Sequence, residues 1–371
     1  MSTIQTNAIV DASGGNTTTV NGISPLANTA RFSRNLVING AMQVAQRGTS
    51  STAQNYQCVD RWRNSHHASQ TITKSQETLT SGDPYDAGFR KFLRMTQGAA
   101  NSVTTDYMQM ATRIEGLDIA SSGWRYTSSS SHITASFWVR SSLAGEYQIY
   151  TQTRSSSGDK YYFKKFNLVA DTWKKVTCSI AGDSGIAIDY DNTTGLEFRI
   201  VPYYGTDYTG DRSSEEGVWT DYNASELDDF PQNWCATSGA TFDFTGVQLE
   251  VGDTATDFEH RSYAEELSLC QRYYCQSVPG SRTAPSQTNE MLFGRGESYI
   301  SWTYPVLMRA TPSVVTSNDL GAGSGRYTVA AVGNYTNGVV LRNGPNQYSM
   351  LTPSTNSSYN TKTGYNADAE L

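Results

Sequence analysis

The sequence predicts an all-β protein whose central domain is a β-sandwich of the jelly-roll type. Only 17% of its 371 residues are charged, whereas it contains 31 glycines and 23 tyrosines. A chain that is poor in Lys and Glu and rich in Thr and Tyr disfavours helices and favours strands joined by tight turns. Short runs of alternating apolar and polar residues, separated by Gly, Asp and Asn, then favour a sandwich over a barrel enzyme.

The clearest predicted strand lies in the segment HITASFWVR, where apolar and polar side chains alternate. Because successive side chains of a strand point to opposite faces, this alternation predicts a half-buried strand. One face carries Ile133, Ala135, Phe137 and Val139, and the other carries Thr134, Ser136, Trp138 and Arg140. Further strands are predicted at 147–153, 161–169, 173–180 and 196–201.

The segment FDFTGVQLEV predicts a strand that contains a β-bulge. Its apolar alternation begins with Phe242 and Phe244 and resumes from Val247, so the parity changes around Gly246. One extra residue lets a strand bend while it keeps its core face.

A connecting helix is predicted over 262–278. Ser262 followed by Glu265 forms a capping-box pattern at its start, and Pro279 ends it. The chain therefore divides into an extended arm over 1–34, the jelly-roll sandwich over 35–261, this helix, and a smaller C-terminal β module over 279–371.

The N-terminal arm is polar, with isolated apolar residues and a Gly-Gly break. Such a segment cannot bury enough apolar area to offset the entropy lost when it becomes ordered. We expect either a tail or a peptide that docks on another protein. Its apolar candidates for docking are Ile4, Ile9, Val10, Val20 and Ile23.

Charge and hydropathy exclude several classes of partner. The net charge is −7, and no basic run exceeds the pairs Lys164-Lys165 and Lys174-Lys175, so we expect no nucleic-acid partner. No apolar run approaches the about 18 residues of a membrane span, and no signal-peptide pattern appears, so we expect a soluble protein made in the cytosol. Five scattered cysteines without a CxxC pair indicate free thiols.

Acidic residues gather in the segment from 202 to 234. A glycosidase needs two carboxylates at a fixed separation, one of them kept protonated, and a pair such as Glu215 and Glu216 is the candidate. Solvated loop acids are the preferred interpretation. The chain also lacks a GxSxG elbow and the Lys-Ser/Thr of a P-loop, so we expect no catalytic residues, no cofactor and no enzyme activity.

The same segment is unusually aromatic. Aromatic rings beside Asp, Asn and Arg suit a sugar-binding surface, because a ring stacks on the apolar face of a sugar while polar groups bind its hydroxyls. The alternative is that these rings pack a long loop onto the sandwich or into a subunit contact. The candidates for carbohydrate binding are Tyr203, Tyr204, Tyr208, Trp219, Tyr222 and Trp234.

No metal site is expected. The adjacent His66 and His67 would point to opposite sides of a strand, so they do not form a ligand pair for a transition metal. Structural Ca²⁺ suits the loop carboxylates around Asp189 and Asp191 better. An ordinary Asp-Asn turn is nevertheless the preferred interpretation there.

Several motifs together resemble a known family. They are NLVINGAMQVAQRG at 35–48, Val59-Asp60-Arg61-Trp62, TWKKVTCSIAGD around Trp173, and GVQLEVGDTATDFEHRSYAEELSLCQRYY at 246–274, and the chain closes with NADAEL. In this order they resemble the tail-fibre and related virion structural proteins of bacteriophages, notably those of marine and cyanobacterial phages. The central module of that family looks like a carbohydrate-binding jelly roll.

This resemblance implies a structural virion protein, most simply a homotrimeric tail fibre that contacts host-surface polysaccharide. The arm would then anchor the fibre to the phage tail or to an adaptor protein. A capsid or tail decoration protein with a stabilising role is the alternative hypothesis, and a polysaccharide depolymerase is the third. The loop from 203 to 232 looks like an addition to the family's shorter connection, so we expect host-specific contacts there.

Overall fold

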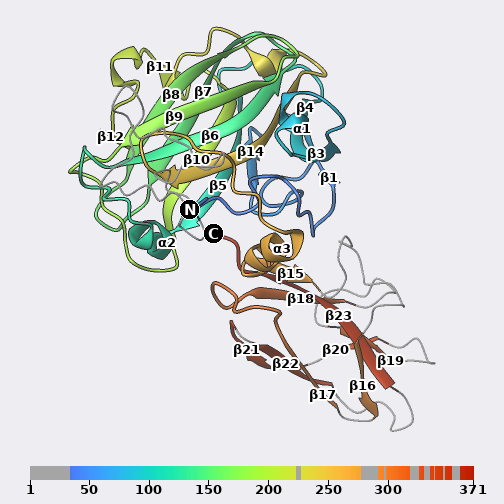
Figure 1. Cartoon of the computed structure of the whole chain (residues 1–371). Helices are drawn as coiled ribbons and strands as arrows, with labels where there is room; N and C mark the ends of the chain where they lie inside the picture. The colour runs from blue at the N-terminus through green and yellow to red at the C-terminus, as the bar shows by residue number, and fades with distance from the viewer. Residues whose placement is uncertain are drawn as a thin grey trace, which may run out of the picture.

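Two antiparallel sheets packed face to face form the body of the protein (Figure 1). The computed structural model describes residues 34–222, 227–276, 291–295, 298–317, 326–329, 335–337, 339–345, 347–352 and 360–371. The predicted anchoring residues of the arm (Ile4, Ile9, Val10, Val20 and Ile23) therefore lie outside the described residues.

The first sheet has the strand order β1, β3, β4, β14, β6, β9, and the second has the order β12, β8, β7, β10, β5, β2. This arrangement confirms the predicted sandwich. The strands of the first sheet are β1 (Ser50–Ser51), β3 (Ile72–Thr78), β4 (Lys91–Gln97), β14 (Thr241–Val251), β6 (His132–Ser141) and β9 (Lys174–Ala181). Those of the second are β12 (Thr220–Asp221), β8 (Lys160–Leu168), β7 (Gly145–Thr153), β10 (Thr194–Tyr204), β5 (Tyr107–Glu115) and β2 (Arg63–His66).

Several short helices and strands lie in the connections between the strands of the sandwich. A parallel pair joins two strands of the loop that follows β10. Among the described residues, no helix is long and apolar enough to cross a membrane. The short elements are α1 (Asp83–Asp86), α2 (Gly116–Ser121), η1 (Ser213–Glu215), η2 (Trp234–Ala236), β11 (Thr209–Gly210) and β13 (Leu227–Asp228).

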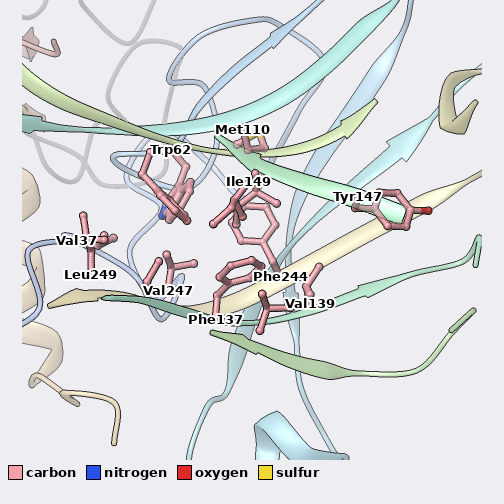
Figure 2. Packing of buried hydrophobic residues seen from close by; sticks show 14 of the residues in the cluster. Val37, Trp62, Met110, Phe137, Val139, Tyr147, Ile149, Phe244, Val247 and Leu249 are labelled. Atoms are coloured by element: carbon pink, nitrogen blue, oxygen red, sulfur yellow. The ribbon is translucent and has the colours of Figure 1, made fainter. Parts of the chain in front are cut away.

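The hydrophobic core fills the space between the two sheets (Figure 2). The four apolar residues predicted to share one face of β6 are all fully buried there, as is Phe244 of β14. Trp62 meets Phe244 edge to face, with ring centres 5.0 Å apart. All five cysteines are free and buried, in agreement with the predicted thiols.

The predicted β-bulge of β14 is confirmed. The pairing of β14 with β6 shifts register between Thr245 and Gln248, and Gly246 has a φ of 63°. Only glycine adopts this left-handed conformation readily. The bulge returns Val247 and Leu249 to the core side, where both are buried.

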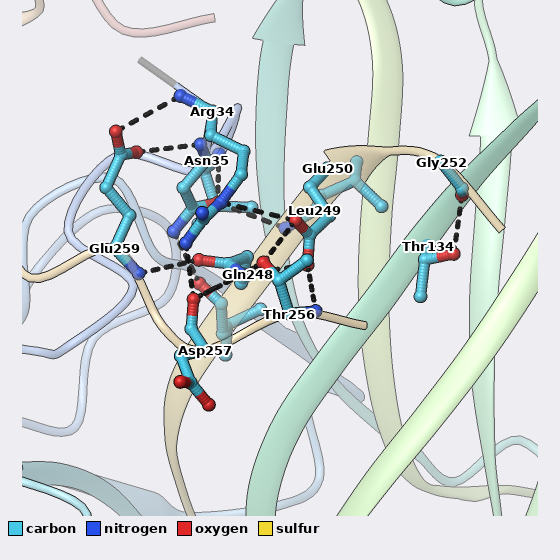
Figure 3. Close-up of polar contacts among 12 residues, drawn as sticks. Arg34, Asn35, Thr134, Gln248, Leu249, Glu250, Gly252, Thr256, Asp257 and Glu259 are labelled. Atoms are coloured by element: carbon cyan, nitrogen blue, oxygen red, sulfur yellow. Dashed lines mark hydrogen bonds and ion pairs between the residues drawn. The ribbon is translucent and has the colours of Figure 1, made fainter. Parts of the chain in front are cut away.

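A polar network ties the start of the sandwich to β14 (Figure 3). The side-chain oxygen of Asn35 accepts hydrogen bonds of 3.0 Å from the backbone N–H groups of Val37 and Leu249. Its amide nitrogen donates to the carbonyl of Val247 at 3.1 Å. The Glu259 carboxylate accepts a 2.7 Å bond from the backbone N–H of Asn35. Residues that are more than 200 positions apart thus close one end of the sandwich.

Asn39 links two more of the recognised motifs. Its amide nitrogen donates to the carbonyls of Val44, at 2.8 Å, and Asp60, at 2.9 Å. The backbone carbonyl of Asn39 accepts a hydrogen bond from the indole nitrogen of Trp62 at 3.2 Å, and its backbone N–H donates to the Glu266 carboxylate. The motifs at 35–48, 59–62 and 246–274 therefore meet in space, and these contacts give their residues a structural role.

The predicted connecting helix is shorter than expected. Helix α3 (Tyr263–Gln271) begins at Ser262, whose hydroxyl accepts a hydrogen bond from the backbone N–H of Glu265 at 3.2 Å. It ends well before Pro279, because β15 (Tyr274–Gln276) pairs with a strand from the end of the chain. Long-range strand pairing thus overrides the local helical pattern in the second half of 262–278.

The C-terminal strands form a separate β module beyond α3 (Figure 1). The longest, β23, pairs with β15, β16, β18 and β19, while β17, β22 and β21 form a second sheet. The strands are β16 (Met291–Arg295), β17 (Ser298–Thr303), β18 (Ser313–Ser317), β19 (Arg326–Val329), β20 (Tyr335–Asn337), β21 (Val339–Asn343), β22 (Gln347–Thr352) and β23 (Asn360–Asp368).

A cluster of charges around the buried Arg61, the junction cluster, joins this module to the sandwich. Arg61 is 1% exposed, forms an ion pair with Glu370, and lies with its guanidinium 3.4 Å from the ring centre of Tyr273. Arg47 bonds Glu370 at 3.2 Å and Asp368 at 2.9 Å. We define the junction cluster as these five residues. Charges that are removed from water persist only when they are paired in this way.

We predict that Arg61→Leu will destabilise the protein by about 3 kcal/mol, since it leaves Glu370 buried with one cation fewer. Urea unfolding will measure the loss, and limited proteolysis will show earlier cleavage within the C-terminal module. Arg63→Leu is the matched control, because Arg63 bonds Asn55 at an exposed position. An equal loss in both variants would contradict a special role for the junction cluster.

A second prediction concerns the acid sensitivity of His66. Burial, together with the positive charge of Lys74, lowers the pKa of His66 from 6.5 to about 4. The folded protein therefore favours neutral His66, and this contribution to stability is complete above pH 6.5 and is lost as the pH falls towards 4.

The melting temperature of the wild type should thus fall more between pH 7.5 and pH 4.5 than that of His66→Gln. His67→Gln, at the neighbouring position, is the matched control. Identical pH dependence in all three proteins would show that His66 is not the responsible group.

Candidate functional site

The outer face of the first sheet carries a row of side chains beside a second, smaller hydrophobic cluster of Ala41, Leu79, Phe89 and Phe92, against which Trp138 packs. Trp138 of β6 lies in register with Lys175 of β9 on one side and with Thr245 of β14 on the other. Trp138 is half-buried and Lys175 is exposed. Because all three positions are on paired strands, the sheet holds their backbones rigidly.

A cavity of about 290 Å³ opens at this row, and we call it the Trp138 pocket. Three aromatic rings are packed together beside it. The ring centre of Phe258 lies 4.8 Å from that of Phe89 and 5.0 Å from that of His260, and the ring centres of Phe89 and His260 are 5.1 Å apart. The pocket therefore combines aromatic walls with a polar rim. It is lined by Ala87, Phe89, Ser136, Trp138, Lys175, Gly246, Asp257, Phe258 and His260.

The bulge of β14 shapes the floor of the Trp138 pocket. A Cβ atom at Gly246 would lie 2.5 Å from the Phe89 ring, so only glycine lets this ring approach the strand. Phe89 follows α1, and the Nε2 atom of His260 lies 3.2 Å from the carbonyl oxygen of Ala87 in the same segment. Two loops are thus fastened over the sheet to form the pocket.

A charged group borders the pocket on the same face of the sheet. The Asp243 carboxylate forms ion pairs with the guanidinium groups of Arg94, with an N–O distance of 2.8 Å, and Arg140, with an N–O distance of 2.6 Å. The hydrogen bond to Asp243 raises the pKa of Arg94. The guanidinium of Arg140 lies 4.8 Å from the ring centre of Trp173, which meets Phe92 edge to face. Aromatic and charged side chains therefore alternate across this face.

This arrangement can hold a small ring-shaped ligand. Aromatic faces such as that of Trp138 offer stacking to apolar C–H groups, and the rim offers an ammonium, a hydroxyl and a carboxylate from Lys175, Ser136 and Asp257. A pocket with aromatic walls and a few polar groups is typical of a binding site.

Three of the six predicted carbohydrate-binding residues lie in the main hydrophobic core, and Tyr204 is buried in a smaller cluster. Trp234 is fully buried, and its indole nitrogen donates to the carbonyl of Thr241 at 3.4 Å. Trp219 donates in the same way to Ala181 at 2.8 Å, and Tyr203 also belongs to the core. These positions agree with the alternative interpretation, in which the aromatics pack the loop onto the sandwich.

The other three predicted residues lie on or near the second sheet. Tyr204 and Tyr208 pack against Tyr107, with ring centres 5.9 Å and 5.4 Å away. Tyr222 is 51% exposed, the most exposed ring of the six, and borders a hollow beside the turn between β7 and β8. The structure therefore does not bring the six residues together, and sugar contact by them stays a prediction.

The acids of the same loop are engaged with nearby groups. Glu215 accepts a hydrogen bond from Tyr161 and pairs with Arg212 at 2.9 Å, and the bond from Tyr161 lowers its pKa. Partial burial would raise the pKa of Glu216, but its bond with Lys164 outweighs this and the pKa is lowered. Neither carboxyl group is held protonated, as a general acid of a glycosidase must be.

The loop carboxylates considered for calcium accept hydrogen bonds instead. Asp189 accepts from the backbone N–H of Ser156 at 2.7 Å and from the hydroxyl of Ser155 at 3.2 Å. Asp191 accepts from the backbone N–H and the hydroxyl of Thr193, at 2.8 Å and 2.6 Å. Each carboxylate thus stabilises a turn. Within the described part of the chain, no group of His, Cys, Asp and Glu is arranged to hold a metal ion.

Sequence reasoning missed the Trp138 pocket, although one signal pointed to it. The alternation in β6 places Trp138 on the face with Ser136 and Arg140, away from the core. A large aromatic residue on the polar face of a strand indicates packing or binding outside the main core, and Trp138 packs there against the smaller cluster that contains Phe89 and Phe92. The partners Phe89 and Phe258 come from remote loops, so no local pattern could reveal them.

No family model and no curated protein matches the sequence. Among solved structures, the chain is similar to a CBM4 module, with 13% identity over 58% of this chain and 98% of that chain and a TM-score of 0.31. It is also similar to the family 11 carbohydrate-binding module of a cellulosomal cellulase of Clostridium thermocellum, with 10% identity over 58% of this chain and 99% of that chain and a TM-score of 0.30.

A third similar structure is the enzymatically active domain of Bacteriophage CBA120 tailspike protein 4. The match has 9% identity and a TM-score of 0.34, and it covers 59% of this chain. This chain spans 22% of the tailspike chain. At these identities the similarities concern the fold alone.

We predict that Gly246→Ala will destabilise the protein by about 1–3 kcal/mol more than Gly239→Ala, the cost of overpacking against Phe89. Both glycines have positive φ values, 63° and 76°, so both variants carry the same kind of backbone strain. A Cβ at Gly239, however, meets nothing within 4 Å. Urea unfolding of the two variants will test this, and equal losses would show that Phe89 moves aside without cost.

Proposed function

We propose that this chain is a non-enzymatic structural protein of a bacteriophage virion, a homotrimeric tail fibre that contacts host-surface carbohydrate. The observation that supports carbohydrate contact is the Trp138 pocket, in which aromatic walls and a polar rim are mounted on a rigid sheet. The virion role rests on the resemblance of the motifs at 35–48, 59–62 and 246–274 to phage fibre proteins.

The ligand that best suits the Trp138 pocket is one sugar residue of a polysaccharide. The cavity of about 290 Å³ is small, and its walls come from Phe89, Trp138 and Phe258. A sugar ring presents an apolar C–H face to such rings and directs its hydroxyls to the rim. Weak binding at one pocket is compatible with attachment, because three chains in a fibre, and several fibres on a particle, act together.

The proposal of a non-enzymatic role is supported by the state of the loop acids. The pKa values of Glu215 and Glu216 are both lowered, which keeps both groups ionised. A glycosidase requires one acid whose pKa is raised. The arm over 1–34 would bind the phage tail or an adaptor protein, with order gained on assembly.

We expect Trp138→Ala to weaken carbohydrate binding by about tenfold or more, since the variant removes a stacking wall of the pocket. The full chain and the variant would be applied to an array of purified lipopolysaccharide O-chains and capsular polysaccharides. Tyr263→Ala is the matched control, because Tyr263 is an exposed aromatic residue on α3, outside the pocket. Unchanged binding by Trp138→Ala would refute the pocket as the contact site.

The position in the virion needs a separate test. Electron microscopy of phage particles labelled with antibody against the C-terminal module, from residue 279 onward, should show label on projecting tail appendages. Label spread over the capsid would instead establish a decoration protein.

A further inference from the structure

The turn between β7 and β8 is held rigidly by carboxylates from two directions. Asp159 accepts from the side-chain amide of Gln152 at 3.0 Å and pairs with Arg154 at 2.9 Å. From the other side, Asp189 binds the backbone N–H of Ser156 and the hydroxyl of Ser155. Groups that are positioned in advance lose little freedom when a ligand binds.

Two hollows flank this turn, with volumes of about 450 Å³ and about 540 Å³. Ser155, Ser156 and Asp159 line both of them, so the hollows meet at the turn. We call the two together the turn cleft. Each hollow is larger than the Trp138 pocket, and both are shallow and open to solvent, which suits a sugar chain that lies along the surface.

The charges of the turn cleft are balanced by pairing. Arg154 pairs with Asp159, and Lys160 pairs with Asp221 at 3.0 Å. A third cation, Arg113, bonds Glu197 at 2.8 Å. A cleft whose cations are already paired offers little attraction to an acidic ligand, but it presents donors and acceptors in fixed positions.

Tyr222 supplies an aromatic surface at the rim. Its side chain is 51% exposed, and its backbone N–H donates to the carbonyl of Asp159 at 3.1 Å. This bond fastens the rim to the turn. An exposed ring beside fixed hydroxyls and carboxylates is the combination that binds the two faces of a sugar.

We propose that the turn cleft is a second carbohydrate site, which binds an uncharged oligosaccharide segment. Tyr222 stacks on one sugar ring, while Ser155, Ser156 and Asp159 bind hydroxyl groups across the turn. The site uses other residues than the Trp138 pocket and belongs to the other sheet, although its biological purpose rests on the proposed function. Two sites on one chain bind a polysaccharide with greater avidity than either site alone.

The test begins with the full-length Trp138→Ala variant, applied to an array of purified neutral and acidic bacterial polysaccharides. We expect residual binding to neutral polysaccharides, and a further loss of at least tenfold when Tyr222→Ala is added. Tyr263→Ala is the control. If circular dichroism shows that Trp138→Ala is unfolded, Tyr222→Ala is compared with Tyr263→Ala in the otherwise wild-type chain, where a loss of neutral-polysaccharide binding in Tyr222→Ala alone supports the turn cleft and equal binding overturns it.

The two proposals fail in different ways. If Trp138→Ala alone removes all binding, or if Tyr222→Ala removes none of the residual binding, the turn cleft is not a site. A preference of the residual binding for acidic polysaccharides would also overturn the proposal. If Trp138→Ala binds like the wild type while Tyr222→Ala abolishes binding, the turn cleft is confirmed and the Trp138 pocket is refuted.

Discussion

The burial of Arg61 is the constraint on which the arrangement of this protein depends. A guanidinium that is 1% exposed requires a partner charge and a surface to lie on, and both come from remote segments: Glu370 near the end of the sequence and Tyr273 after α3. The backbone at Arg61 has a φ of 69°, and the next residue, Trp62, enters the core. Two adjacent residues thus act in different places: Trp62 packs in the core of the sandwich, and Arg61 attaches the C-terminal module.

This attachment leaves the outer surfaces of the sandwich to other uses. Residues of the motifs that resemble phage fibre proteins make structural contacts with one another, as the hydrogen bonds of Asn35 and Asn39 show. The proposed turn cleft lies outside these motifs, after β7, whereas the Trp138 pocket takes Gly246, Asp257, Phe258 and His260 from the motif at 246–274. At the proposed turn cleft, framework and recognition would therefore be carried by different residues, so the ligand there could change while the fold persists.

The two proposed sites share one physical design. In each, an aromatic side chain stands beside polar groups whose positions are fixed by strand pairing or by hydrogen bonds: Trp138 in register with Lys175, and Tyr222 bonded to Asp159. Neither site relies on a net charge, which suits contact with uncharged sugar residues. Affinity would arise from several such contacts rather than from one.

The sequence by itself determined the strands, the bulge at Gly246 and the capped start of α3, because alternation and caps are local patterns that act within a few residues. It could not determine which aromatic residues remain accessible. The sequence places Trp234 in a polar loop and Trp138 on the polar face of a strand, yet Trp234 is fully buried in the core and Trp138 is half-buried beside a pocket that remote loops complete. Only the tertiary structure decided this, since exposure depends on which distant segments pack over a side chain, and sequence proximity does not encode that packing.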